Sequence, residues 1–278
     1  MIASTSGRLA VRGTLYLAML AAAASVGGST MQNLRHAARL SRLSRPFHAS
    51  PEAAEASVLI VGDSTALGTG ASTPQASLAG RIAARYPSLR IRNLARAGAR
   101  FADIAEQLRD VGQHDLILVA GGANDVMRFT SESRLARDID LTLHRAASQA
   151  GRVILLPAPN VGNAPFFPRP LSWLLSYRAR LLHRLARASA GTVGAAYVDL
   201  YREHAADPFA QDPQRLIAAD RLHPSDAGYA VWFDELERQA PLAGLLDVSI
   251  GKKGQTAWPG DLKSVSSQQS CRLSWRRI

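Results

Sequence analysis

Short apolar segments alternate with longer stretches of helical periodicity between residues 58 and 240. Five segments have the length and apolar character of β-strands, at residues 58–61, 90–94, 115–120, 153–157 and 195–200. Three of them are apolar along almost their whole length, which is typical of strands covered on both faces. The pattern therefore indicates a sheet that lies between two layers of helices.

The stretches between these strands have the apolar spacing of amphipathic helices. They cover residues 75–86, 101–110, 132–150, 171–190 and 226–239. A repeated strand-helix-strand order implies right-handed crossovers and a parallel sheet. We therefore expect an α/β fold, a three-layer αβα sandwich around a five-stranded parallel sheet, with ligands bound at the carboxyl ends of the strands.

Composition and charge narrow the function classes. The chain has 278 residues, 47% of them apolar, and a single cysteine, Cys271, so neither an internal disulfide framework nor a zinc site of several thiolates is possible. The net charge of +11 comes mainly from the ends, because residues 58–240 hold 21 arginines against 18 acidic residues. With no basic stripe interleaved with aromatic residues there, the sequence argues against nucleic acid as a partner.

Both ends of the chain differ from its centre. Residues 14–28 form an apolar run after Arg8 and Arg12, which is typical of a secretory signal or a short membrane anchor. Its length favours a cleaved signal and thus export to the periplasm or the medium, whereas four arginines that follow it favour an uncleaved anchor with the domain in the cytoplasm: Arg35, Arg39, Arg42 and Arg45. A start at Met31, which would remove the run, is a third alternative.

Three regions follow from these differences. We predict a signal or anchor segment with a basic linker at residues 1–56, a catalytic or binding domain at residues 57–242, and a disordered basic tail at residues 243–278. All three lysines fall in the tail, which is also rich in serine and glutamine.

Polar residues follow several of the predicted strands. Ser64 comes directly after the first strand in the triplet Gly62-Asp63-Ser64. A serine there is either a helix N-cap or a nucleophile that needs a base to take its proton. The G-x-S-x-G turn of α/β-hydrolases is absent because Ala66 replaces its second glycine.

His223 is the histidine, of seven in the chain, best suited to be that base. It lies in the loop before the last helix, where ligands are expected to bind, and Asp220 three residues earlier can hold its Nδ1. The other six lie in the basic N-terminal segment, on helices or at a strand entrance, where a solvated or core-edge histidine is usual. Ser225 is expected to cap the last helix.

Asn124 follows the third strand and is either an Asx-turn residue or a donor aimed into the site. In the second case its amide would join the backbone N–H groups of Ser64 and Gly98. Three such donors would make an oxyanion hole, which stabilises the negative oxygen formed during acyl transfer.

The arrangement resembles the SGNH hydrolases, also called GDSL-type lipases and esterases. Four blocks match in order: Gly62-Asp63-Ser64, residues 93–98 (NLARAG), Gly122-Ala123-Asn124-Asp125 and residues 220–223 (DRLH). The resemblance spans about residues 57–240 and implies a flavodoxin-like fold with no cofactor and no metal. It assigns Ser64 as nucleophile, His223 as base and then acid, Asp220 as the residue that orients His223, and Ser64, Gly98 and Asn124 as oxyanion donors.

Two positions depart from the family pattern, and neither carries the chemistry. Thr65 stands where leucine is usual, and Ala95 stands where glycine is often found. Asp63, Phe166 and Phe167 are expected to contact the substrate, because they belong to the first block and to the segment after the fourth strand. Core packing is the alternative for the two phenylalanines.

The sequence thus predicts a serine esterase that acts through an acyl-enzyme on a small-molecule, glycan or lipid ester. Short acyl esters, acetylated sugars and lysophospholipids are the substrate types expected. Two alternatives remain: an acyltransferase that uses the same site, and a non-catalytic binder of acylated glycan or lipid.

Overall fold

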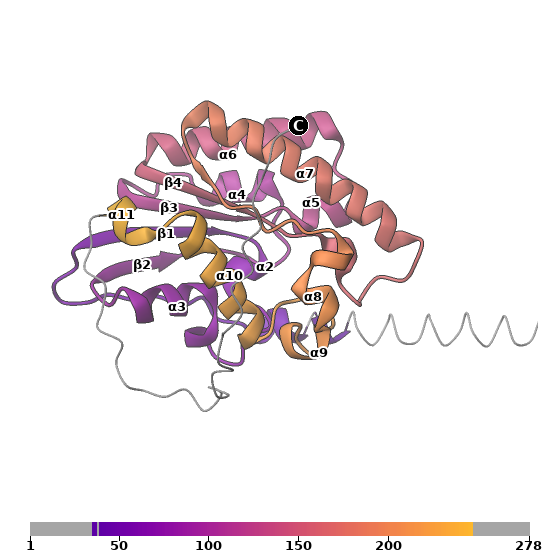
Figure 1. Ribbon diagram of the computed structural model, residues 1–278. Helices are drawn as coiled ribbons and strands as arrows, with labels where there is room; N and C mark the ends of the chain where they lie inside the picture. The colour runs from indigo at the N-terminus through magenta and orange to yellow at the C-terminus, as the bar shows by residue number, and fades with distance from the viewer. Residues whose placement is uncertain (1–34, 38, 247–278) are drawn as a thin grey trace, which may run out of the picture.

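A computed structural model describes residues 35–37 and 39–246, and these contain one five-stranded sheet. Its strands are β1 (Ala56–Gly62), β2 (Leu89–Asn93), β3 (His114–Gly121), β4 (Ala150–Pro157) and β5 (Ala196–Tyr197). All are parallel, in the order β2-β1-β3-β4-β5 (Figure 1). The five predicted strands and their parallel arrangement are therefore confirmed.

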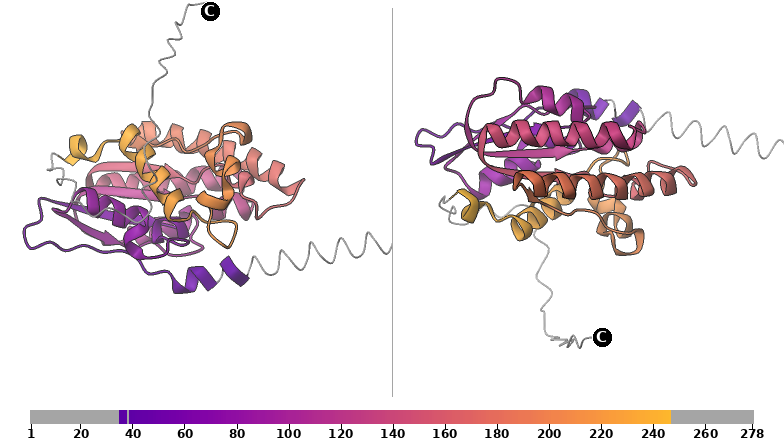
Figure 2. Two further views of the ribbon diagram at one scale, coloured as in Figure 1. Left: turned by 60° about the horizontal axis from the view of Figure 1, so that its bottom comes forward. Right: turned by 90° about the horizontal axis from the view of Figure 1, so that it is seen from above.

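Helices cover both faces of this sheet and make the fold a three-layer αβα sandwich (Figure 2). One face packs against α3 (Leu78–Arg85) and α10 (Asp226–Gln239), and the other against α4 (Phe101–Gln107), α6 (Glu132–Ser148) and α7 (Leu171–Val193). Each layer of helices buries its own apolar cluster against the sheet.

The alternation of side chains along β1 joins the two clusters. Val58 and Ile60 belong to the cluster under α3 and α10, whereas Leu59 and Val61 belong to the cluster under α4, α6 and α7. The strand is apolar throughout because both of its faces are buried. β2 lies at the sheet edge instead, and its arginines Arg90 and Arg92 are exposed.

The structure also differs from the predicted element bounds. The predicted helix at residues 75–86 is divided into η1 (Pro74–Ala76) and α3, because the Ser77 side chain accepts a hydrogen bond from Gly80 N and starts a new helix. The predicted strand at residues 195–200 pairs only over two residues. Several helical segments of three to five residues were too short for periodicity to reveal: α2 (Ser64–Leu67), α5 (Ala123–Met127), η2 (Val161–Asn163), η3 (His204–Ala206), α8 (Pro208–Gln211), α9 (Pro213–Leu216) and α11 (Leu242–Leu246).

The folded unit reaches beyond both predicted domain bounds. Ala49 exchanges two backbone hydrogen bonds with Ile91 of β2, and Phe47 packs on the cluster under α3 and α10. At the other end Ala243, Leu245 and Leu246 pack on the same cluster. The predicted signal or anchor at residues 14–28 and the tail from residue 247 lie outside the described residues.

Candidate active site

The turn after β1 is built around Gly62. A Cβ on this glycine would lie 1.9 Å from the carbonyl oxygen of Ala120 on β3, so no other residue fits there. Asp63 then caps α2, because its Oδ1 accepts hydrogen bonds from the backbone N and the hydroxyl of Thr65. The N-cap considered for Ser64 thus belongs to Asp63, and Ser64 is the first residue of the helix.

Gln107 on α4 holds the same turn from below. Its Oε1 accepts from Gly62 N at 2.8 Å and its Nε2 donates to Gly62 O at 2.9 Å. Sequence reasoning missed this residue. A glutamine on the buried side of a helix, between Ile104 and Leu108, is the signal that could have revealed it.

Ser64, His223 and Asp220 form one hydrogen-bonded chain. Ser64 Oγ lies 2.8 Å from His223 Nε2, and His223 Nδ1 lies 2.5 Å from Asp220 Oδ2. The second carboxylate oxygen of Asp220 accepts the backbone N–H groups of Leu222 and His223, both at 3.0 Å. Because a carboxylate only accepts hydrogen bonds, Nδ1 carries the proton toward Asp220 and Nε2 can accept the proton of Ser64.

The loop that carries Asp220 and His223 is fixed at both ends. Ile217 and Pro224 form an antiparallel bridge, and Arg221 between the two site residues takes a left-handed conformation with φ of 64°. The Ser225 side chain accepts from Gly228 N and so caps α10, as predicted. A hydrogen bond joins α10 to the segment after α2: the Tyr229 hydroxyl donates to the carbonyl oxygen of Thr69 at 2.8 Å.

Two buried carboxyl groups near Ser64 have pKa values shifted in opposite directions. Burial raises the pKa of Asp220, but the hydrogen bonds and charge of His223 outweigh it and leave this pKa below its ordinary value. Burial also raises the pKa of Asp63, and there the bonds from Thr65 do not compensate. Asp220 is therefore the better stabiliser of a protonated imidazole.

The expected oxyanion donors belong to three segments: Ser64 begins α2, Gly98 lies in the loop between β2 and α4, and Asn124 is the second residue of α5. Among the described residues, no hydrogen-bond acceptor meets the backbone N–H of Ser64 or of Gly98. Gly98 has φ of 80°, a left-handed conformation that favours glycine. The Asn124 amide nitrogen donates to Ala99 O at 3.1 Å, which turns this amide toward the loop of Gly98.

Asp125 of α5 joins the start of α4, directly after the loop of Gly98, to the loop after α5. Its carboxylate accepts from Phe101 N at 2.9 Å, at the start of α4, and from the Thr130 hydroxyl at 3.0 Å. Because Asp125 is completely buried, burial raises its pKa despite these bonds. The block Gly122-Ala123-Asn124-Asp125 therefore contains one residue that faces the loop of Gly98 and one that anchors the start of α4 directly after it.

A small apolar cavity opens beside Ser64 and His223. It measures about 70 Å³ and is walled by residues from six segments: Thr65, Ala123, Met127, Ala158, Pro159, Asn160, Val161, Asn163, Ala164, Asp207, Phe209, Ile217, Leu222, Pro224 and Trp232. Asp207 is buried in this wall and accepts from Asn163 Nδ2 at 2.6 Å. Neither Asp207 nor Phe209 was predicted, because they belong to the irregular segment between β5 and α10.

Asp63, Phe166 and Phe167, the residues expected to contact substrate, lie outside this cavity wall. Asp63 is fully buried next to Ser64 in the chain. Phe166 is buried, and its backbone N donates to Arg221 O in the histidine loop. Phe167 lines a second cavity of about 470 Å³, which shares Asn160, Asn163 and Ala164 with the first. Substrate contact by these three residues stays a prediction, and their positions favour supporting roles.

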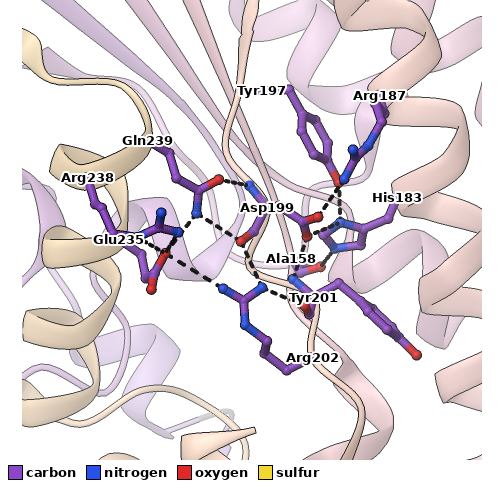
Figure 3. A network of polar contacts seen from close by, with 10 residues as sticks. All are labelled: Ala158, His183, Arg187, Tyr197, Asp199, Tyr201, Arg202, Glu235, Arg238 and Gln239. Carbon is purple, nitrogen blue, oxygen red and sulfur yellow. Dashed lines mark hydrogen bonds and ion pairs between the residues drawn. The ribbon is translucent and has the colours of Figure 1, made fainter. Parts of the chain in front are cut away.

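His183 is the other buried histidine of the described chain, and it belongs to a separate polar network (Figure 3). Its Nε2 donates to Ala158 O at 2.8 Å, and its Nδ1 faces the Tyr197 hydroxyl and Asp199. The network joins α7 to the ends of β4 and β5. His183 thus has the structural role expected of a core-edge histidine, and it holds a backbone carbonyl of the cavity wall.

Within residues 35–37 and 39–246, no group of three or more His, Cys, Asp or Glu side chains is arranged to hold a metal ion.

Fold and site together define an α/β protein with a serine, a histidine and an aspartate joined at the carboxyl edge of a parallel sheet. A model of the GDSL-like Lipase/Acylhydrolase family matches residues 60–231, which is more than half of the chain. The chain belongs to this family, and the resemblance inferred from the four sequence blocks is confirmed.

Individual relatives agree with this assignment. The GDSL-like esterase Rv1075c of Mycobacterium tuberculosis is 29% identical over 195 residues, which are 64% of this chain and 60% of that protein. The crystal structure of LAE5, an alpha/beta hydrolase enzyme from the metagenome of Lake Arreo, Spain, has a TM-score of 0.53 and 24% identity, covering 70% of this chain and 97% of that one. A lipase/acylhydrolase from Enterococcus faecalis has a TM-score of 0.53 and 20% identity, covering 71% and 99%. These two structures share the fold.

Proposed function

We propose that this protein is a carboxylic ester hydrolase that acts through a Ser64 acyl-enzyme. The observation that carries the proposal is the continuous hydrogen-bonded chain from Ser64 Oγ through His223 to Asp220. Membership of the GDSL-like lipase/acylhydrolase family supports the same activity.

In the proposed reaction the Ser64 oxygen attacks the ester carbonyl carbon while His223 Nε2 takes the hydroxyl proton. The carbonyl oxygen becomes negative and accepts from the backbone N–H groups of Ser64 and Gly98 and from the Asn124 amide. His223 then gives its proton to the leaving alcohol. Water then attacks the acyl-enzyme in the same way: His223 takes a proton from the water and returns it to Ser64 Oγ as the acid leaves.

The cavity beside Ser64 supports a short acyl group. Its volume of about 70 Å³ is far below the ~300 to 1,000 Å³ of sites that enclose a drug-sized ligand. Phe209 and Trp232 are part of its wall, so each added methylene would meet a packed side chain. The alcohol side of the ester, whether a sugar or a lipid, would extend out of this cavity.

The first test is to replace Ser64 by alanine and to measure hydrolysis of p-nitrophenyl acetate and butyrate. We expect kcat to fall by at least about 10⁴-fold because no nucleophile remains, with the circular dichroism spectrum unchanged. A fluorophosphonate probe should label the wild type and not the variant, which would distinguish an enzyme from a binder of acylated molecules.

The matched control is Ser77→Ala, which removes a helix-capping hydroxyl on the same side of the sheet. This variant should be less stable and yet keep its activity. Full hydrolysis by the Ser64 variant would overturn the nucleophile assignment. Faster turnover of p-nitrophenyl octanoate than of the butyrate would leave the hydrolase proposal intact and contradict the short acyl group.

A further inference from the structure

Large apolar side chains are exposed together at one end of the molecule. Seven are well exposed in the described chain, and five of these form what we call the α7 patch: Phe129 (46%), Leu171 (37%), Trp173 (62%), Leu174 (48%) and Tyr177 (63%). Four belong to the first two turns of α7. Several large exposed apolar side chains in neighbouring segments of a folded domain usually mark an interaction surface.

The patch is formed by two segments, the start of α7 and the loop after α5, which a hydrogen bond joins. Arg178 of α7 donates a hydrogen bond to Thr130 O, which fixes the loop after α5 against the helix. Phe129 in that loop has φ of 54°, an unfavourable left-handed conformation for an aromatic residue. The backbone at Phe129 is therefore strained, and this strained conformation leaves the phenyl ring half exposed.

Two exposed arginines flank the patch, Arg128 and Arg169 on the neighbouring segments. The whole of α7 contains four arginines and no acidic residue, and three of these arginines pair with acidic residues of other segments. Arg128, Arg169 and Arg178 have no carboxylate partner among the described side chains. Arg169 lies 5.6 Å from the centre of the Trp173 ring. Tryptophan and tyrosine with flanking arginines are the residues that occupy the boundary between acyl chains and headgroups of a bilayer.

The patch adjoins the catalytic cavity. Met127 lines that cavity, and Phe129 follows two residues later. Trp173 lines the larger second cavity, which shares Asn160, Asn163 and Ala164 with the catalytic one. A surface that meets the patch would therefore lie beside the opening through which an ester reaches Ser64.

The N-terminal end of the described chain lies at the same end of the molecule. The helical residues 39–43 and the first turns of α7 both lie toward the end to which the strands run, in every view (Figures 1 and 2). Leu43 there is 65% exposed. The 34 residues before the described chain include the apolar run at residues 14–28. A chain held in a bilayer by that run would enter the domain at the same end of the molecule as the patch.

We propose that the α7 patch docks on an anionic lipid surface and turns the opening of the active site toward it. The apolar side chains would enter the headgroup region while the exposed Arg128 and Arg169 bind lipid phosphates. The proposal concerns the surface alone and does not depend on whether Ser64 is a nucleophile.

The test places a polarity-sensitive nitrobenzoxadiazole (NBD) label on the patch of the full-length protein. In a Cys271→Ser background, Leu174→Cys carries the label, and Leu141→Cys serves as the matched control because Leu141 is a similarly exposed leucine, at 44%, on α6. Glu132 at the start of α6 pairs with Arg184, ten residues along α7 from Leu174, so Leu141 lies far from the patch.

With vesicles of phosphatidylcholine containing about 30% phosphatidylglycerol, we expect label 174 to shift to shorter wavelength and brighten several-fold. Lipids with nitroxide-labelled acyl chains should quench it, and label 141 should not change. Phosphatidylcholine alone or high salt should weaken the response, because part of the attraction is electrostatic.

Three results would overturn the proposal. In the first, the protein floats with the vesicles while label 174 behaves like label 141, which would mean that another segment binds the lipid. In the second, label 174 is already shielded without vesicles, which would mean that a second copy or the chain's own N-terminal residues cover the patch. In the third, vesicles of either composition give the same response.

The variant Leu174→Glu in the unlabelled protein separates this proposal from the proposed function. It should hydrolyse soluble p-nitrophenyl butyrate at the wild-type rate and lose several-fold on an ester embedded in anionic vesicles. A wild type inactive on both substrates would contradict the hydrolase and leave the labelling result valid. Equal loss on both substrates would contradict the docking surface.

Discussion

The Asp220 carboxylate determines which nitrogen of the His223 ring carries the proton. Its Oδ1 is held by two backbone N–H groups, so only Oδ2 faces His223. In an Asp220→Asn variant the carbonyl oxygen would stay with those backbone groups and the NH₂ would face Nδ1. Nδ1 would then have to accept, and the ring proton would move to Nε2, where it blocks proton transfer from Ser64.

We therefore expect Asp220→Asn to fold and to lose about 10⁴-fold in kcat, by analogy with other triads. Hydrolysis of p-nitrophenyl acetate measures this loss. Asp212→Asn is the control, because Asp212 is partly exposed and pairs only with Arg215. A loss below tenfold in the Asp220 variant would contradict the orienting role.

The same residue predicts a dependence of stability on pH. The folded-state pKa of Asp220 lies below its ordinary value of 3.8. A lowered carboxyl pKa contributes stability that is complete above the ordinary value and is lost as pH falls through the folded value. Urea unfolding should therefore show a smaller loss of stability between pH 5 and pH 3 in Asp220→Asn than in the wild type, and an equal loss would contradict the shift.

At the scale of elements, the contact of α4 with β1 fixes the position of the turn that carries Ser64. The Gln107 side chain forms hydrogen bonds with both polar groups of Gly62. In Gln107→Leu the buried N–H of Gly62 would lose its partner, which costs about 1 to 3 kcal/mol, whereas Gly62 O would keep the hydrogen bond from Arg96 N at 3.1 Å. The turn that carries Ser64 would then move away from His223.

We expect Gln107→Leu to lower the unfolding free energy by about 1 to 3 kcal/mol and to lower kcat more than it raises KM. Gln113→Leu is the matched control, because Gln113 is exposed and makes one exposed hydrogen bond, to Ser148 O. Urea titration and steady-state kinetics on both variants test the prediction. Similar effects of the two substitutions would show that Gln107 does not position the turn.

For the whole molecule, the folded unit is longer at its N-terminus than the alternating pattern indicated. The hydrogen bonds of Ala49 with Ile91 and the packing of Phe47 join residues 47–49 to the β2 edge. A chain that begins at residue 57 lacks these contacts. Its edge strand would expose unpaired backbone groups, which favours aggregation.

A chain of residues 57–246 should accordingly unfold at a temperature at least about 5 °C below that of residues 44–246, because one partly buried aromatic ring and two hydrogen bonds are worth about 2 to 4 kcal/mol. Thermal unfolding followed by circular dichroism compares the two. Equal midpoints would place the true start of the domain near residue 57.

Local periodicity and turn chemistry made much of this protein predictable. The five strands, the long helices, the Ser225 cap and the pairing of Asp220 with His223 depend on residues close together in the chain. The short helices and the division of the first predicted helix at Ser77 depend on single hydrogen bonds, which a periodic pattern does not contain. The same holds for the capping role of Asp63.

By itself the sequence determined the order of strands and helices, because the period of apolar positions is a local property. Only the tertiary structure decided which distant residues meet: Ser64 lies 2.8 Å from His223, 159 residues later, and Asn163 meets Asp207 in the cavity wall. It also gathered five exposed apolar side chains from two segments beside the active site. The physical reason is that such contacts depend on how the helical layers pack on the sheet, and that packing depends on the whole chain.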